Sequence, residues 1–261
     1  MTSFIGVPAD RTSEAADGVI HLAFTHDFSD YAGAGRTERA AVRRMLDAIE
    51  GSGRPFLLAS GLVHLTPGRS AREDDASPRR TADSVRGGSE NLALSCADRG
   101  VWPVALRFAP TVHGSGDGGF VSVPVDIART RSPAGCIGDG SSRWAAVHVA
   151  DAARLVRLAL HTAPPAFRVH AAAGEGIPSR DIASALGDFL GLPTVSVPPE
   201  DAAEHLGWIG HFFGLDQPTS SARTRELHTH RPDTPRRHRC GRVHGAWAAA
   251  DRYASVRGTR R

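Results

Sequence analysis

A strand-helix-strand pattern within residues 19–60 sets the expected fold class of this chain. Residues 19–24 form a short apolar run, as expected of a strand that is covered on both faces. Apolar residues then recur at the helical spacing i, i+3, i+4, i+7 from Val42 to Ile49, and residues 56–59 form a second apolar run. Two such strands joined by a helix form a parallel, right-handed β-α-β unit.

The alternation of strands and helices continues to residue 190. The pattern predicts three more strands and three more helices, with Asp151 as a helix cap and with residues 121–129 as a poor helix because of Pro124. The whole pattern indicates an α/β fold with a parallel sheet. The strands are expected at residues 101–108, 143–149 and 167–171, and the helices at residues 89–99, 151–160 and 178–190.

The basic residues exclude several kinds of chemistry. All 31 are arginine, because the sequence contains no lysine. A Schiff-base lysine, a Walker A lysine and a Tyr-x-x-x-Lys pair are therefore ruled out. The sequence also lacks the Gly-x-Ser-x-Gly turn that presents the nucleophile of α/β-hydrolases, which argues against that class.

Cysteine usage and hydropathy suggest where the protein resides. The three cysteines, Cys96, Cys136 and Cys240, are far apart and odd in number, so they do not form a disulfide framework. No leader-like segment opens the sequence, and no apolar stretch reaches the roughly 18 residues of a membrane span. We therefore expect a cytoplasmic protein that does not bind membranes.

The last 41 residues differ from the rest in charge. Residues 221–261 carry a net charge of +8, which leaves −5 for the remainder of the chain. Few large apolar residues occur there, so we expect a disordered basic tail. Nonspecific nucleic-acid binding by this tail is an alternative function, although the few aromatic residues argue against it. Its histidines and Cys240 do not have zinc-finger spacing, so no metal site is expected.

Five motifs in a fixed order carry a family resemblance. They are Asp17–Phe24, Phe56–Gly61, Leu106–Gly114, Gly138–Trp144 and Val147–Asp151. The chain resembles the NAD-dependent epimerase/dehydratase family, as an atypical, extended short-chain dehydrogenase/reductase. The resemblance implies a Rossmann-like sheet that binds NAD or NADP, with a small lobe that binds a small carbonyl or sugar-type substrate.

The resemblance also implies domain limits and site residues. A Rossmann-like core is expected at residues 1–125, a C-terminal substrate lobe at residues 126–222 and the tail at residues 223–261. Family positions that contact the cofactor match Ala23, Phe24, Ser60, Pro110 and Val112. Family positions that contact the substrate match His113, Arg143 and Trp144.

Two departures limit what the resemblance implies. The family begins with a β-α-β half that holds the cofactor pyrophosphate, but only sixteen residues precede Asp17 here. We therefore expect weak cofactor binding and self-association through an uncovered sheet edge. The family's catalytic Tyr and Lys align with Arg86 and Glu90, which leaves Ser60 as the candidate catalytic residue and makes catalytic competence doubtful.

Two alternatives stay open. Residues 114–119 read Gly-x-Gly-x-x-Gly and are followed by Asp139, as in a dinucleotide fingerprint, although the distance from the preceding strand favours a flexible turn. The second alternative is that the chain is a non-catalytic remnant or a binding protein of the same fold. Cofactor binding separates these interpretations.

Overall fold

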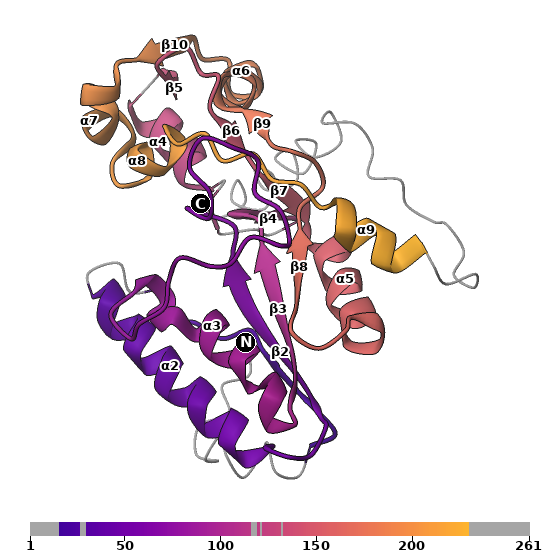
Figure 1. Cartoon of the computed structure of the whole chain (residues 1–261). Helices are drawn as coiled ribbons and strands as arrows, with labels where there is room; N and C mark the ends of the chain where they lie inside the picture. Colours follow the sequence, from indigo (N-terminus) through magenta and orange to yellow (C-terminus); the bar gives the residue numbers. More distant parts are fainter. Residues whose placement is uncertain (1–15, 27–29, 116–118, 121, 132, 230–261) are drawn as a thin grey trace, which may run out of the picture. The chain divides into compact units, whose positions relative to one another are not determined.

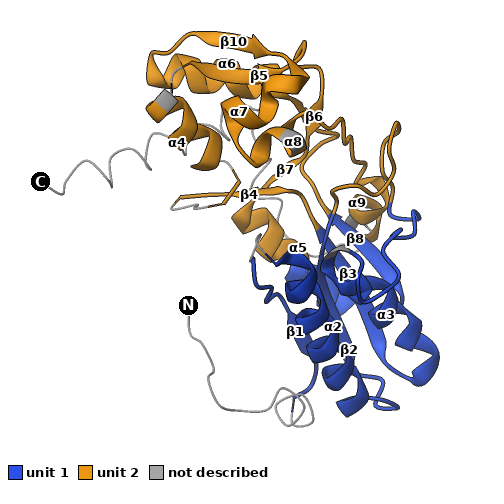
Figure 2. Cartoon of the chain, turned by 90° about the vertical axis from the view of Figure 1, so that its left-hand side faces the viewer, with its two compact units in different colours: residues 1–61, 73–107, 156–170 blue, residues 62–72, 108–155, 171–261 orange. Residues whose placement is uncertain are grey.

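The structure is a computed structural model that describes residues 16–26, 30–115, 119–120, 122–131 and 133–229. It contains two compact units that interleave along the sequence (Figure 2). Unit 1 comprises residues 1–61, 73–107 and 156–170, and unit 2 comprises residues 62–72, 108–155 and 171–261. These units differ from the contiguous segments 1–125 and 126–222 that the resemblance implies, because the chain passes repeatedly from one unit to the other.

The main sheet of the fold confirms the expected parallel α/β architecture (Figure 1). Its strand order is β1-β2-β3-β8, with β1 at one edge. Strand β1 pairs in parallel with β2, so that Val19 lies opposite Phe56. The strand bounds are β1 Val19–His21, β2 Pro55–Gly61, β3 Trp102–Phe108 and β8 Phe167–Ala171.

Helix α2, Tyr31–Ala48, connects β1 and β2. The side chain of Asp30 caps it by accepting a hydrogen bond of 2.8 Å from the Gly33 amide. The apolar face predicted by the helical spacing packs into the core of unit 1. That core consists of Val42, Met45, Leu46, Ile49, Phe56, Leu58, Ala93, Cys96 and Val101.

A left-handed turn precedes the helix that was expected at residues 89–99. Arg86 and Gly87 each have φ of 55° and Gly88 has φ of 60°, within the short helix η1, Val85–Gly88. A Cβ atom on Gly87 would lie 2.2 Å from the Gly35 carbonyl oxygen, so α2 and this turn are in direct backbone contact. The helix itself is divided into α3, Ser89–Leu94, and η2, Ser95–Arg99.

The described residues of unit 2 form three pairs of short strands. Two pairs are parallel and one is antiparallel. The larger of the two apolar clusters among the described residues of this unit includes Trp144. The parallel pairs join β4 Thr111–His113 to β7 Ala146–His148 and β5 Ala134–Ile137 to β10 Thr194–Val197, and the antiparallel pair joins β6 Arg143–Trp144 to β9 Ile177–Pro178.

The helices of unit 2 include several that the sequence did not predict. Helix α4 forms despite Pro124, because that residue lies in the first turn, where a backbone N–H has no helical partner. Strands β5 and β10 and helices α7 and α8 were missed because each is only four or five residues long. The helices are α4 Ser122–Arg131, α6 Ser179–Leu190, η3 Pro199–Asp201, α7 Ala202–Leu206, α8 Ile209–Phe213 and α9 Ala222–Thr229, while α5 Val149–Thr162 extends from unit 2 into unit 1.

Helix α9 occupies the first residues of the segment 223–261 that was expected to be a disordered tail, so that expectation is wrong for residues 223–229. The hydroxyl of Ser220 accepts a hydrogen bond from the Ala222 amide, and the Arg225 guanidinium donates to the hydroxyl of Ser221. The expected basic tail beyond residue 229 lies outside the described residues. Within the described part of the chain, no helix has the length and apolar character needed to cross a membrane.

Candidate functional site

A small polar cavity lies at the carboxyl end of β2 in unit 1. Strand β2 contributes Ser60, helix α2 contributes Glu38, and the left-handed turn with α3 contributes Arg86 and Glu90. The cavity has room for about one water-sized oxygen atom. The complete lining is Glu38, Ala59, Ser60, Ser77, Arg79, Arg86, Gly88, Ser89 and Glu90.

Glu90 is held by several partners. Its Oε1 accepts a hydrogen bond of 2.6 Å from Nη2 of Arg107, its Oε2 accepts one of 2.6 Å from the Ser60 hydroxyl, and Nε of Arg168 lies 3.4 Å from Oε1. Burial alone would raise the pKa of the Glu90 carboxyl, but Arg107, Ser60 and Arg168 outweigh it and hold this pKa below its ordinary value. Glu90 is therefore an ionised, fully engaged carboxylate.

Arg107, the partner of Glu90, is completely buried in strand β3, with 0% of its side chain exposed. Its Nη2 also donates to the Asp75 carbonyl at 2.8 Å, and its Nη1 lies 3.2 Å from Nε2 of His170. A buried charge is tolerated only where such partners replace water. Glu90, which the resemblance aligns with the family's lysine, thus forms an internal ion pair with Arg107.

Glu38 and Arg86 form a second ion pair, which is less complete. Nη2 of Arg86 donates to Oε1 of Glu38 at 2.8 Å and to the carbonyl of Ala59, next to Ser60, at 3.3 Å. Among the described residues, Oε2 of Glu38 and Nε of Arg86 have no hydrogen-bond partner. Burial raises the pKa of the Glu38 carboxyl, although the charge of Arg86 and the nearby Ser89 hydroxyl offset part of this effect.

Arg86 also connects Phe24 to the cavity. Its guanidinium carbon lies 4.3 Å from the centre of the Phe24 ring, which is a cation–π contact. The Phe24 ring in turn lies 5.4 Å from the Tyr31 ring. Of the residues expected near the cofactor, Phe24 and Ser60 are therefore both in contact with cavity-lining groups, whereas Ala23 is exposed just after β1.

The remaining expected site residues lie in unit 2. Val112 and His113 are in β4, where the His113 ring lies 5.4 Å from the ring of His148. Pro110 immediately precedes this strand and lies beside Leu62 in a narrow crevice. None of these contacts involves a cavity-lining residue of unit 1.

Arg143 and Trp144, which were expected to bind substrate, are both engaged within unit 2. Nε and Nη2 of Arg143 donate to the two carboxylate oxygens of Asp216, at 2.9 and 2.8 Å. Trp144 is only 3% exposed, and its indole N–H donates to the hydroxyl of Thr111 at 2.7 Å. Both side chains thus have polar partners within unit 2. Their contacts with a substrate stay predictions.

Sequence reasoning missed Glu38 and Arg107, although each leaves a detectable signal. Glu38 lies four residues before Val42, on the apolar face of α2, where a carboxylate is unusual. Arg107 interrupts the apolar run of β3. A charged residue within a pattern of buried residues indicates a buried partner of opposite charge.

The described residues contain no group of His, Cys, Asp and Glu that could hold a metal ion. Cys96 and Cys136 are free and buried. Cys240 and the tail histidines beyond residue 229 lie outside the described part of the chain.

Comparison with known proteins identifies relatives in two yeasts. The uncharacterized protein YLL056C of Saccharomyces cerevisiae is 38% identical over 211 residues, which are 81% of this chain and 70% of that protein. The uncharacterized protein C2A9.02 of Schizosaccharomyces pombe is 37% identical over 211 residues, covering 80% of this chain and 71% of that protein. No protein-family model matches the sequence.

Solved structures with a similar fold include sugar-nucleotide enzymes. MoeE5 in complex with UDP-glucuronic acid and NAD is 19% identical with a TM-score of 0.68, over 97% of this chain and 83% of that chain. DesIV, a dTDP-glucose 4,6-dehydratase of Streptomyces venezuelae with NAD bound, is 18% identical with a TM-score of 0.71, over 96% and 77%. The chain belongs to the family of the two yeast proteins, and its fold is that of the NAD-dependent epimerases and dehydratases of the extended short-chain dehydrogenase/reductase group.

Proposed function

We propose that this chain forms the nicotinamide and substrate side of an NAD(P)-dependent oxidoreductase or epimerase-like protein that acts on a small carbonyl or sugar-type compound. The observation that carries this proposal is the polar cavity beside Ser60, at the carboxyl end of a parallel strand. Open α/β sheets bind their ligands at this edge. The NAD bound in neighbours of the same fold supports the proposed cofactor.

The described residues of unit 1 fit one end of the dinucleotide better than the other. Phe24 and Ser60 follow or end adjacent strands, where a nicotinamide ring would lie against the sheet edge. The connection between β1 and α2, residues 22–30, contains no glycine, and the carboxylate of Asp30 already binds the Gly33 amide at the start of α2. The carboxylate at this helix start would repel a pyrophosphate and already occupies an amide that could bind it.

A bound nicotinamide would supply or accept the hydride, while the residues of this chain would hold the substrate oxygen. The Ser60 hydroxyl donates its hydrogen to Glu90, so its lone pairs are left to accept a hydrogen bond from a substrate hydroxyl. The Arg86 guanidinium, on the same cavity, would stabilise negative charge on that oxygen. For Pro110, Val112, His113, Arg143 and Trp144 of unit 2, the contacts with cofactor or substrate that the resemblance implies stay predictions.

A second candidate function is ligand binding without hydride transfer. It is favoured by the ion pair of Glu90 with Arg107, which occupies the place of the family's catalytic lysine. In this case the chain retains the cavity but not the chemistry. Turnover of nicotinamide cofactor with small carbonyl compounds separates the two candidates.

An NMR titration tests the proposed function directly. We expect nicotinamide riboside and NAD to bind with similar dissociation constants, above about 1 mM, because the described residues provide no binding site for the phosphates. Backbone signals of Phe24 and Ser60 are expected to shift, and Ser60→Ala should weaken both ligands equally. If saturating concentrations of both ligands leave these signals in place, the proposal is wrong. Micromolar binding of NAD alone would instead direct attention to the glycines of residues 114–119.

A further inference from the structure

Three buried polar atoms without hydrogen-bond partners belong to residues that line the same small cavity. They are Oε2 of Glu38, Nε of Arg86 and Oγ of Ser89. Buried polar atoms are almost always hydrogen-bonded, so a group of them at one cavity points to a missing partner. The cavity has room for about one oxygen atom, which could accept from Arg86 and share a proton with Glu38.

The backbone holds Arg86 at this position independently of its ion pair. Nη1 of Arg39, one turn beyond Gly35 on α2, donates to the carbonyls of Gly87 and Gly88, at 2.8 and 3.2 Å. Arg86 itself has φ of 55°, a left-handed conformation that non-glycine residues rarely adopt. Strained backbone of this kind persists where surrounding contacts fix it, and it clusters at functional sites.

The charges around Glu38 are arranged for a carboxyl that can exist in either protonation state. Arg86 favours the carboxylate, whereas burial of the side chain, which is only 3% exposed, favours the neutral acid. The phenol of Tyr31, from the same helix, interacts electrostatically with Glu38, and Arg79 and Glu90 line the cavity. Glu90, by contrast, is held ionised by its partners.

We propose that Glu38 is the proton-exchanging residue of the Ser60 cavity, with Arg86 as the cation that stabilises the resulting charges. This inference rests on the proposed function and names the acid-base group of the same site. It places that role on α2, whereas the family alignment places it at residues 86 and 90.

The proposed step moves one proton and no electrons. The hydroxyl of a small substrate lies in the cavity beside Ser60, with its hydrogen directed at Oε2 of Glu38 rather than at the Ser60 oxygen. Its O–H bond breaks, an O–H bond forms at Glu38, and the negative charge passes from the carboxylate to the substrate oxygen beside Arg86. In the reverse direction, neutral Glu38 protonates that oxygen.

Proton linkage of ligand binding tests this role. Dihydroxyacetone, which carries hydroxyls and a carbonyl, serves as the probe in calorimetric titrations of the full chain in two buffers of different ionisation enthalpy. We expect binding to be accompanied by net proton exchange near the pKa of Glu38. Glu38→Gln should abolish the exchange and weaken binding about tenfold, or 1.4 kcal/mol, while Glu38→Asp should keep part of the exchange.

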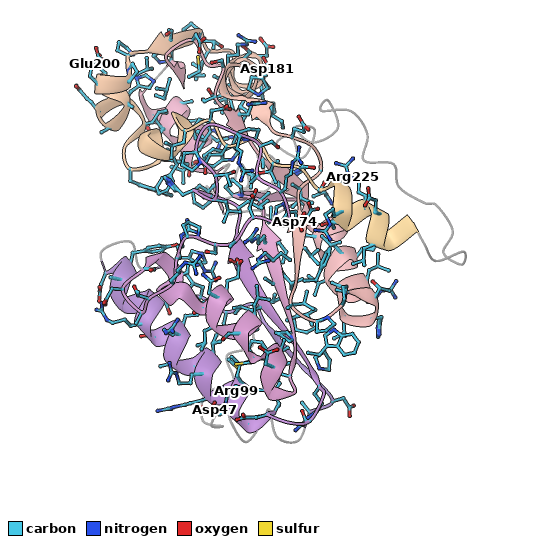
Figure 3. The ribbon with its side chains drawn as sticks, viewed as in Figure 1. Asp47, Asp74, Arg99, Asp181, Glu200 and Arg225 are labelled. Atoms are coloured by element: carbon cyan, nitrogen blue, oxygen red, sulfur yellow. The ribbon has the colours of Figure 1, made fainter. Side chains whose placement is uncertain are left out.

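Asp47→Asn is the matched control, because Asp47 lies on the same helix at the end remote from Glu38. It forms an ion pair with Arg99, beside which it lies in Figure 3. This variant should retain the proton exchange in full. A second readout follows the Glu38 carboxyl by carbon NMR, with the signal assigned by its absence from Glu38→Gln, and this carboxyl should titrate above the ordinary range of glutamate.

Three results would overturn the proposal. They are binding of the probe without proton exchange, exchange that survives in Glu38→Gln, and no binding of the probe to the wild-type chain. If the cavity holds only a structural water, the first or third result is expected. None of these results bears on the nicotinamide titration, so the proposed function and the role of Glu38 fail separately.

Discussion

The two ion pairs beside the Ser60 cavity use the same residue types but differ in completeness. Glu90 has its charge matched by Arg107, with Ser60 and Arg168 as further partners. Glu38 has one direct ion-pair partner, Arg86, and one oxygen left without a hydrogen bond among the described residues. The first pair holds a strand and a helix together, whereas the second retains the capacity to change its protonation. Buried charge alone therefore does not identify a functional carboxylate; unsatisfied buried charge is the more useful sign.

The largest expected effect comes from breaking the complete pair. Arg107→Ala leaves the Glu90 carboxylate buried without its main partner, and we expect it to lower the free energy of unfolding by about 3 to 5 kcal/mol. Urea unfolding followed by circular dichroism measures this loss. Arg99→Ala, at the exposed ion pairs with Asp47 and Glu50, is the control and should leave stability nearly unchanged. Equal losses in the two variants would contradict the distinction between buried and exposed pairs.

A smaller effect is expected from the turn that carries Arg86. Gly87→Ala adds a Cβ that would meet the Gly35 carbonyl, at a left-handed φ of 55°. We expect it to lower the free energy of unfolding by about 2 to 3 kcal/mol. Gly53→Ala has a similar φ of 67° but nothing within 4 Å of the added atom, so its loss should be only about 1 kcal/mol. Thermal melts of both variants measure the difference, which is due to the contact with α2.

The two glutamates should give stability opposite dependences on pH. The raised pKa of Glu38 means that its contribution is present in full below the ordinary value of 4.5 and is lost as the pH rises through the folded-state pKa. The lowered pKa of Glu90 means that its contribution is present above 4.5 and is lost as the pH falls through the folded-state pKa.

Urea unfolding of Glu38→Gln and Glu90→Gln between pH 3 and pH 8 (roughly the range in which buried carboxyls titrate) measures these contributions. The free energy of unfolding of the wild type should fall relative to that of Glu38→Gln as the pH rises above 4.5. The deficit of Glu90→Gln should shrink as the pH falls below 4.5. Parallel pH profiles for the two variants would show that both glutamates are equivalent structural partners.

The smallest expected effect is that of Glu38→Gln on stability at neutral pH. An amide avoids the cost of burying a carboxylate but weakens the bond to Arg86, so we expect a change within about 1 kcal/mol. Differential scanning calorimetry of this variant beside wild type provides the measurement. A loss as large as that of Arg107→Ala would place Glu38 among the structural ion pairs.

Much of unit 1 follows from sequence pattern, because its elements are long enough to show periodicity. The apolar spacing from Val42 to Ile49 predicted the core face of α2, and the apolar runs predicted β2 and β3. Short elements such as β5 and α8 escaped, since four or five residues cannot distinguish a helical period from a strand.

The candidate site was predictable only in part. Family motifs led to Ser60, Arg86 and Glu90, which the structure brings together at one cavity. The partners Glu38 and Arg107 come from other elements, and a pairing across 48 or 17 residues of sequence leaves no local spacing to detect. Such pairings are determined by how the helix and strands pack.

The interleaving of the two units affects how this protein can be taken apart. The chain passes between the units after residues 61, 72, 107, 155 and 170, so no single cut in the sequence releases either unit as a continuous polypeptide. A chain shortened at its C-terminus to residue 170 would keep every segment of unit 1 but only part of unit 2, and a chain that begins at residue 62 would keep unit 2 but only part of unit 1. Because the units are interleaved, most members of a nested deletion series are expected to fold incompletely. Single-residue substitutions are therefore the better means of assigning roles to residues of this chain.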